Sequence, residues 1–187
     1  MPQAVILTVD RLIDHVSTAP AIAGESVQLF VREKVRASIA HAASGEVPAE
    51  KILLMVHGGY WPCVNGVDLQ YRDYSWMEAL ASAGYDVFAM DMTGYGFSSR
   101  PLMDNPANLP PDYQEALIPR TLSEHRPPTH PVKLITSNSE TDDIDRVVDF
   151  ICKLRGVDKI SLLGWSGGGI RTGTYTVRHQ EKVEKLI

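Results

Sequence analysis

The stretch LLGWSGGGI (residues 162–170) surrounds one serine with four glycines and follows directly on an apolar run. Residues 164–168 fit the pattern G-x-S-x-G, which places a serine on a sharp turn from a strand into a helix. The turn is tight, so the positions beside the serine must be small, which indicates supporting roles for Gly164 and Gly168. We therefore expect Ser166 to be a nucleophile. The alternative is a glycine-rich helix start whose serine has no chemical role.

Short apolar runs and helical patterns alternate along the chain. Three runs lack period-two alternation and end in turn-forming residues, which predicts strands buried on both faces, at 51–56, 85–90 and 159–164. Apolar residues at helical spacing, or a glycine-rich helix start, predict helices at 71–84, at 139–156 and from about 167 to 179. This order predicts an α/β fold with a mostly parallel central sheet and flanking helices.

Two further segments complete the expected domain. Residues 25–35 alternate in polarity and predict an antiparallel strand at the edge of the sheet. Residues 97–140 hold eight of the twelve prolines and show little periodicity, which predicts a long loop over the strand ends. No repeat or linker divides the chain, so residues 1–187 are expected to form a single domain.

A second glycine-rich segment, VHGGYWP (56–62), follows the first predicted strand. Enzymes with a serine turn of this kind place half of their oxyanion hole at this point. We expect Gly59 to donate through its backbone N–H, with Tyr60 as the next candidate, and Gly58 to support the motif. His57 directly follows the strand, which favours a structural role in orienting the loop through ring hydrogen bonds over a role as a base.

Composition excludes several classes of partner. The formal net charge of −5, without a clustered basic stripe, gives no reason to expect nucleic acid. No apolar stretch approaches the ~20 residues that a membrane span needs, and the N-terminus lacks a basic region, so the cytoplasm is the default location. Cys63 and Cys152 show no metal-ligand spacing, and no metal or cofactor is expected. GYGFSS (94–99) has no clear helix behind it, so nucleotide binding is a third and weaker hypothesis.

The segments 56–62, 91–101 and 162–170, in this order, resemble the α/β-hydrolase family, in its serine-nucleophile branch. The resemblance spans most of 25–187. It implies that Ser166 is the nucleophile, that the oxyanion-hole donors are Gly167 and Gly59, and that Asp91 to Ser98 form a structural turn near the pocket. It argues against haloalkane dehalogenases and epoxide hydrolases, which carry aspartate where this chain has serine.

In this family the acid and the histidine of the triad follow the nucleophile. The only histidine after Ser166 is His179, roughly 20 Å away along a helix that rises about 1.5 Å per residue. His125 and His130 precede the serine, an order that the family does not use. We therefore expect the acid and histidine to be missing from this chain, which would then be an incomplete N-terminal portion, inactive alone. A second chain or a C-terminal segment would complete the fold.

The resemblance predicts a serine hydrolase that acts on a carboxylic ester or related carbonyl through an acyl-enzyme on Ser166. Tyr60, Trp61 and Trp165 suggest a small-molecule substrate with an apolar or aromatic group. Esterase, lipase, thioesterase, peptidase and carbon–carbon hydrolase activities all stay open. The alternative is a non-catalytic α/β-hydrolase-like protein that binds a ligand or a partner.

Overall fold

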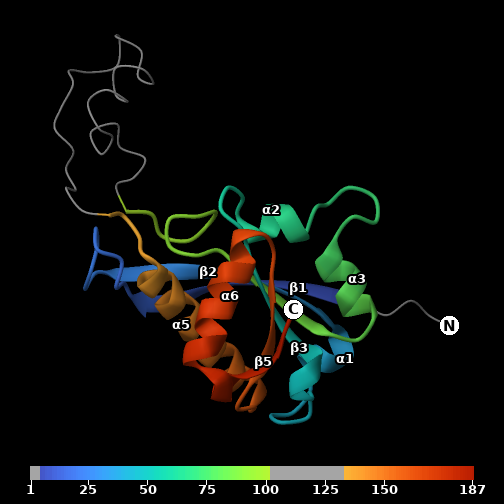
Figure 1. Cartoon of the computed structure of the whole chain (residues 1–187). Coiled ribbons are helices and arrows are strands. Elements are labelled where there is room, and N and C mark those ends of the chain that lie inside the picture. Colours follow the sequence, from blue (N-terminus) through green and yellow to red (C-terminus); the bar gives the residue numbers. More distant parts are fainter. Residues whose placement is uncertain (1–4, 102–132) are drawn as a thin grey trace.

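The computed structural model describes residues 5–101 and 133–187, which form a six-stranded sheet in the order β1-β2-β4-β3-β5-β6 (Figure 1). The strands are β1 (Ile6–Val16), β2 (Ser26–Arg36), β3 (Ile52–Val56), β4 (Asp86–Met90), β5 (Ile160–Gly164) and β6 (Val183–Leu186). Strands β3 to β6 are parallel to one another, whereas β2 runs antiparallel to both of its neighbours, β1 and β4. The predicted α/β architecture with a mostly parallel sheet is confirmed.

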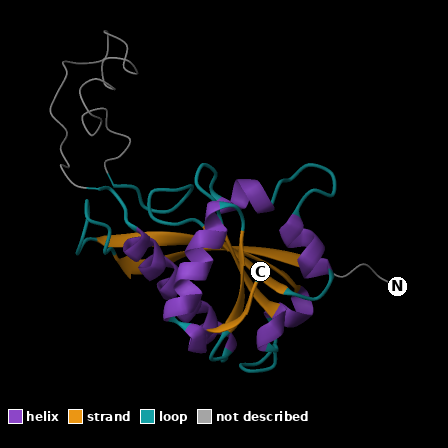
Figure 2. Ribbon diagram, viewed as in Figure 1, coloured by secondary structure: helices purple, strands orange, loops and turns teal. Residues whose placement is uncertain are grey.

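Helices cover both faces of the sheet (Figure 2). They are α1 (Ala37–Ala40), α2 (Cys63–Val67), α3 (Trp76–Ser82), α5 (Ser137–Arg155) and α6 (Gly167–Arg178), with short 3₁₀ turns η1 (Ala49–Lys51) and η4 (Gln180–Lys182). Apolar side chains of α5 and α6 pack on one face, and those of α2 and α3 pack on the other. None of the helices in the described ranges is long and apolar enough to cross a membrane.

The central strands form where the apolar runs predicted them. Every residue of β3 and β4 is buried, as expected for strands with helices on both faces. The three central strands begin one residue later than the predicted runs, which is within the usual uncertainty of strand ends. The strand predicted at 25–35 is also present, as antiparallel β2.

The position of β2 at the sheet edge was predicted wrongly. β1 lies outside it and pairs with it along its whole length, from Ile6 opposite Arg36 to Val16 opposite Ser26. Charged residues interrupt the apolar pattern of β1, and we therefore did not predict this strand. In the structure, Asp10 lies directly opposite Arg32 and forms a 2.7 Å ion pair with it, so the interrupting charge stabilises the strand pair.

Two helix starts differ from the prediction. Helix α5 begins at Ser137 rather than after Ser139 or Thr141, because Thr136 and Ser139 form a reciprocal capping box. The last four residues of the predicted 97–140 loop are therefore helical, and its residues 102–132 lie outside the described residues. Helix α3 begins only after Ser75, whose hydroxyl accepts the hydrogen bond of the Glu78 N–H. The short helix α2 was not predicted.

A buried cluster of charges joins the last turn of α5 to the sheet. The Arg155 guanidinium donates to Asp86 at 2.5 Å and also forms an ion pair with Glu33, and all three side chains are almost fully buried. Burial raises the pKa of Asp86, and the nearby carboxylate of Glu33 raises it further. Arg155 therefore lies between two carboxylates that would otherwise repel each other, and Arg11 forms a second ion pair with Glu33, at 2.5 Å.

A second buried carboxylate joins α5 to the segment after β4. Asp143 accepts hydrogen bonds from the N–H and the hydroxyl of Thr93, at 2.8 and 3.1 Å, and lies 3.4 Å from the His15 ring. Burial raises the pKa of Asp143 to about 6, although the bonds from Thr93 act in the opposite direction. The folded protein therefore holds a proton on this group in a pH range where the unfolded chain has released it.

We predict that Arg155→Met lowers the free energy of unfolding by about 3 to 5 kcal/mol, because it leaves the buried Asp86 carboxylate without its cation, whereas Glu33 keeps its ion pair with Arg11. Urea denaturation measures this change. Lys159→Met is the control, since Lys159 forms an exposed ion pair with Glu184 and its loss should change stability little. Equal effects of the two substitutions would contradict the structural role assigned to the buried cluster.

We also predict that Asp143→Asn flattens the dependence of stability on pH. A carboxyl group with a raised pKa in the folded state makes stability fall as the pH rises from about 4 to about 6, by about 2 kcal/mol in total. The asparagine variant should lose this part of the fall in denaturation curves taken across the range, whereas the part caused by Asp86, whose pKa is also raised by burial, should stay.

Asp145→Asn serves as the control on the same helix. Although burial acts the other way, hydrogen bonds from Lys182 and Tyr175 lower the pKa of Asp145. Its contribution is therefore lost only at lower pH, and its replacement should leave the slope between pH 4 and 6 unchanged. A slope in Asp143→Asn equal to that of the wild type would show that Asp143 does not contribute to it.

Candidate active site

Ser166 lies on the turn between β5 and α6, in a strained backbone conformation. Its φ of 55° and ψ of −121° are unusual for a residue with a side chain, and Arg72 is the only other described non-glycine residue with positive φ. A β-carbon at Gly164 would lie 2.5 Å from the Gly168 backbone, and one at Gly168 would lie 2.2 Å from the Val56 carbonyl oxygen. Both predicted supporting glycines are therefore sterically required.

The loop after β3 packs directly against this turn. A β-carbon at Gly58 would lie 3.2 Å from the Ser166 β-carbon, and one at Gly167 would lie 3.5 Å from the Gly59 nitrogen. β3 and β5 are adjacent parallel strands, with Val56 opposite Gly164, so the segments that follow them emerge side by side. The fold thus brings together the two glycine-rich motifs singled out in the sequence.

Two backbone N–H groups beside Ser166 are free to bind a ligand. Among the described residues, the N–H groups of Gly59 and Gly167 donate to no acceptor, whereas the next two N–H groups of α6 bond back to Trp165 and Ser166. The first N–H groups of a helix have no partner within it and carry partial positive charge. This arrangement can stabilise an anionic oxygen next to the serine hydroxyl. The N–H of Tyr60, the other candidate, also donates to no acceptor among the described residues.

Both ring nitrogens of His57 are occupied by the protein. Burial lowers the pKa of His57, so the imidazole is neutral near pH 7. Its Nδ1 lies 2.7 Å from the Gly58 carbonyl oxygen, and its Nε2 lies 3.3 Å from the Met92 nitrogen. The network assigns the proton to Nδ1, which donates to the carbonyl, while Nε2 accepts from the N–H. The two bonds tie the ring to the backbone of the loop after β3 and of the segment after β4, and the structural role of His57 stays a prediction.

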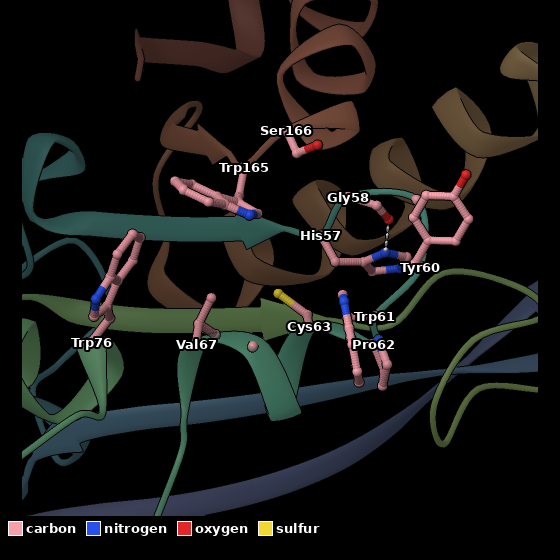
Figure 3. A pocket seen from close by; sticks show the side chains of 12 residues that line it. His57, Gly58, Tyr60, Trp61, Pro62, Cys63, Val67, Trp76, Trp165 and Ser166 are labelled. Carbon is pink, nitrogen blue, oxygen red and sulfur yellow. Dashed lines mark hydrogen bonds between the residues drawn. The ribbon is translucent and has the colours of Figure 1, made fainter.

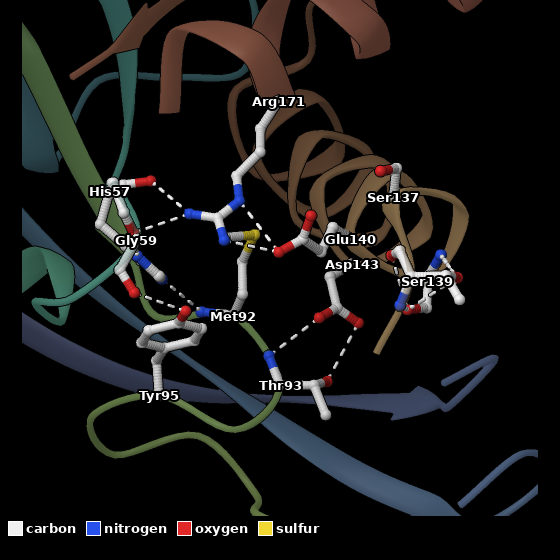
Figure 4. A network of polar contacts seen from close by, with 12 residues as sticks. His57, Gly59, Met92, Thr93, Tyr95, Ser137, Ser139, Glu140, Asp143 and Arg171 are labelled. Atoms are coloured by element: carbon white, nitrogen blue, oxygen red, sulfur yellow. Dashed lines mark hydrogen bonds and ion pairs between the residues drawn. The ribbon is translucent and has the colours of Figure 1, made fainter. Parts of the chain in front are cut away.

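Arg171 is a residue of this site that the sequence analysis missed. From α6 it donates to the carbonyl oxygens of His57 and Gly58, at 2.9 and 2.7 Å, and forms a 2.6 Å ion pair with Glu140 of α5 (Figure 4). The Tyr95 hydroxyl donates to the next carbonyl of the same loop, at 2.7 Å. No sequence motif indicated these contacts, because they join segments that are far apart in the chain.

An apolar pocket of about 440 Å³ opens beside Ser166 (Figure 3). The loop after β3, α2, and the tryptophans Trp61, Trp76 and Trp165 form much of its lining. The Trp76 and Trp165 rings meet edge to face, with centroids 5.8 Å apart. No carboxylate, lysine or arginine is among the described residues that line it, and burial raises the pKa of the Cys63 thiol. The pocket is therefore uncharged near pH 7.

The turn predicted between Asp91 and Ser98 is structural, as expected. The buried Asp91 carboxylate accepts hydrogen bonds from the N–H groups of Cys63, at 2.7 Å, and Phe97, at 3.1 Å. The Ser98 hydroxyl donates to the Asp91 carbonyl oxygen. This aspartate therefore fixes the start of α2, which forms one wall of the pocket, and has no free carboxylate oxygen for chemistry.

The described histidines supply no base for Ser166. His179 lies just past the end of α6, where it stacks on Tyr175 and lies 3.7 Å from Asp145. The remaining sequence candidates, His125 and His130, fall outside the described residues. Within residues 5–101 and 133–187, no group of three or more histidine, cysteine and acidic side chains is placed to hold a metal ion.

Solved structures with the same fold include several hydrolases. An epoxide hydrolase from Vigna radiata aligns with a TM-score of 0.52 and 18% identity over 95% of this chain and 38% of its own. A thioesterase domain from the curacin biosynthetic pathway aligns with a TM-score of 0.52 and 17% identity over 96% of this chain and 43% of its own. A probable hydrolytic enzyme from Pseudomonas aeruginosa aligns with a TM-score of 0.55 and 18% identity over 95% of this chain and 40% of its own.

The chain thus spans less than half the length of these three proteins, and at such low identity the likeness shows the fold alone. No curated protein sequence matches the chain significantly. The sequence profile of the alpha/beta hydrolase fold family matches residues 51–187, a segment that holds β3 to β6, both glycine-rich motifs and Ser166. By this match over most of its length, the chain belongs to the alpha/beta hydrolase fold family.

Proposed function

We propose that the protein is a hydrolase in which Ser166 attacks a carbonyl carbon and forms an acyl-enzyme. The observation that carries this proposal is the position of Ser166, on a strained turn beside the free N–H groups of Gly59 and Gly167. Donors held in place where negative charge develops lower the barrier to acyl transfer, and losing one such donor typically slows an enzyme by about 10²- to 10³-fold.

The reaction proceeds in two steps. The Ser166 oxygen forms a bond to the carbonyl carbon as its proton passes to a base, and the carbonyl oxygen becomes an anion held by the two N–H groups. The intermediate collapses, the leaving group departs with the proton, and an ester on Ser166 remains. Water then attacks this ester by the same route and releases the acid. We propose that the base is a histidine oriented by an acid, both contributed from outside the described residues.

The identity of the nucleophile separates acyl transfer from epoxide opening. A carboxylate that opens an epoxide forms an ester, which water can hydrolyse. A serine that opens an epoxide would form an ether, which water does not cleave under mild conditions. Position 166 is a serine, so its chemistry supports a carbonyl substrate, as for the thioesterase among the structural neighbours. The substrate class that we propose is a carboxylic ester or thioester.

The pocket supports a substrate with an apolar or aromatic group. Three tryptophans and no charged side chain line it among the described residues, so a charged group would lose its hydration without gaining a partner. An aromatic ring can stack against the Trp76 and Trp165 pair, which together form one wall.

Binding of a ligand without turnover is the second candidate function. It is favoured by the two hydrogen bonds of His57, which leave neither ring nitrogen of that histidine free to accept the Ser166 proton. In this case the apolar pocket would still bind its ligand, but Ser166 would not react with a serine-directed probe.

We predict that a fluorophosphonate probe adds once to the full protein, and that Ser166→Ala abolishes both the adduct and ester hydrolysis. Loss of the nucleophile should reduce kcat by at least about 10⁴-fold. Intact-mass spectrometry and a p-nitrophenyl ester assay measure the two effects. Ser161→Ala is the matched control, because Ser161 lies on β5, the strand that leads to the Ser166 turn, and is buried. An unmodified wild-type protein would favour the binding function, and an adduct on Ser166→Ala would overturn the nucleophile assignment.

We also predict that Trp76→Ala lowers kcat/KM for p-nitrophenyl benzoate by about tenfold and leaves p-nitrophenyl acetate nearly unaffected. The lost contact with an aromatic acyl group corresponds to about 1.4 kcal/mol, within the range for burial of apolar surface. Tyr74→Ala is the control, since Tyr74 is exposed and does not line the pocket. An equal loss with both esters would show that Trp76 does not contact the acyl group.

A further inference from the structure

Three consecutive carbonyl groups of the loop after β3 are held on one side by α6 and by the segment after β4. Arg171 donates to the carbonyl oxygens of His57 and Gly58, and Tyr95 donates to that of Gly59. The Gly58 oxygen also accepts the hydrogen bond of the His57 Nδ1–H, so Arg171 is the donor to it that comes from another segment of the chain. Figure 4 shows the Arg171 side chain extended from α6 between this loop and Glu140. The carbonyl oxygens of this loop therefore accept hydrogen bonds from other segments, whereas the Gly59 N–H has no acceptor among the described residues.

The orientation of a carbonyl fixes the orientation of the N–H in the same peptide. A trans peptide is planar, and its C=O and N–H point in opposite directions. No cis peptide occurs in the described residues. The peptide between Gly58 and Gly59 turns its oxygen to Arg171 and the His57 Nδ1–H and so turns the Gly59 N–H away, and this nitrogen lies 3.5 Å from the position that a β-carbon at Gly167 would take. In the same way, Tyr95 sets the direction of the Tyr60 N–H.

This peptide has little intrinsic preference for one orientation. It joins two glycines, which adopt both signs of φ at little steric cost, so a flip of the peptide plane is locally cheap. A flipped peptide would turn the Gly58 carbonyl oxygen toward the reacting centre and repel the developing anion. Something other than local sterics must select the orientation with the N–H next to Ser166.

The Arg171 side chain is itself held in place. Its Nε and Nη2 both donate to one oxygen of Glu140, at 3.0 and 2.6 Å, while its Nη1 reaches the two loop carbonyls. The guanidinium also lies over the Tyr95 ring, 5.7 Å from its centroid. Most of its donors are thus committed, and the planar group links α5, α6 and the loop rigidly.

We propose that Arg171, anchored by Glu140, is a positioning residue that fixes the Gly58–Gly59 peptide so that the Gly59 N–H serves as an oxyanion donor. This inference rests on the proposed function of Ser166. It further assigns the second donor to Gly59 rather than to Tyr60, because the peptide held by Arg171 is the one whose nitrogen lies against the Ser166 turn.

The test compares Arg171→Met with wild type in the full protein. We expect kcat for p-nitrophenyl ester hydrolysis and the rate of fluorophosphonate labelling to fall about 10²-fold, with KM changed less than threefold, because only the transition state carries the oxyanion. Arg171→Lys keeps the charge but cannot donate to the loop and to Glu140 with one planar group, so its kcat should lie between those of Arg171→Met and the wild type. Arg178→Met is the matched control on α6, since Arg178 bonds to Asn138 of α5 without contacting the loop, and its kinetics should equal wild type.

Tyr95→Phe tests which N–H is the donor. It removes the hydroxyl that holds the Gly59 carbonyl but keeps the ring, so we expect kcat to fall less than threefold. A larger loss in Tyr95→Phe than in Arg171→Met would overturn the assignment to Gly59. Wild-type kcat and labelling rate in a folded Arg171→Met would overturn the positioning role while leaving the function of Ser166 intact. If Arg171→Met does not fold, Glu140→Gln replaces it, with an expected fall in kcat of about 3- to 10-fold.

An unlabelled and inactive wild-type protein would instead overturn the proposed function, and the inference would fall with it. The two failures are thereby distinguished, because the first requires a reactive wild type and the second excludes one.

Discussion

The site depends on the close approach of two backbones at the carboxyl end of the sheet. The first turn of α6 lies so near the end of β3 that a β-carbon at Gly168 would overlap the Val56 carbonyl oxygen. A side chain there would push α6 away from the loop after β3 and separate the Gly59 nitrogen from the Ser166 turn. The glycines around the serine therefore allow the sharp turn between β5 and α6. They also allow α6 to approach the end of β3 closely.

The strand order makes this approach possible. β3 lies between β4 and β5, all three parallel, so the loop after β3 and the turn after β5 leave the sheet at the same edge and side by side. Ligand sites of open α/β sheets form at the carboxyl ends of the strands for this reason. The pocket occupies the adjoining space, with α2 and α3 forming its outer wall.

Buried polar groups act at both ends of the central strands. At the amino end of β4, Arg155 ties the last turn of α5 to Asp86 and Glu33. At the carboxyl end, His57, Arg171 and Tyr95 take up carbonyls of the loop after β3. The first cluster holds a helix on the sheet, whereas the second determines which backbone groups face the serine. Buried polar networks of this kind define a single conformation because each unpaired group would be costly.

Much of the central architecture could be predicted from local patterns. Apolar runs without alternation located β3, β4 and β5, and steric limits on a tight turn located Ser166 and its glycines. Apolar patterns did not indicate β1, because charged residues interrupt its sequence. Asp10 fits into this strand because Arg32 lies opposite it. Local patterns also failed where several caps competed, since Thr136, Ser139 and Thr141 are all acceptable N-caps and the capping box selected the first.

The sequence by itself determined the serine turn, the buried parallel strands and the family resemblance, because sterics and periodicity act over a few residues. Only the tertiary structure decided how the Gly59 N–H, which the resemblance had already indicated, is held beside Ser166. That orientation follows from Arg171 reaching carbonyls 113 and 114 positions away in the sequence, while Glu140 of another helix holds the same guanidinium. Such contacts depend on how three distant segments pack together, and no short-range pattern encodes them.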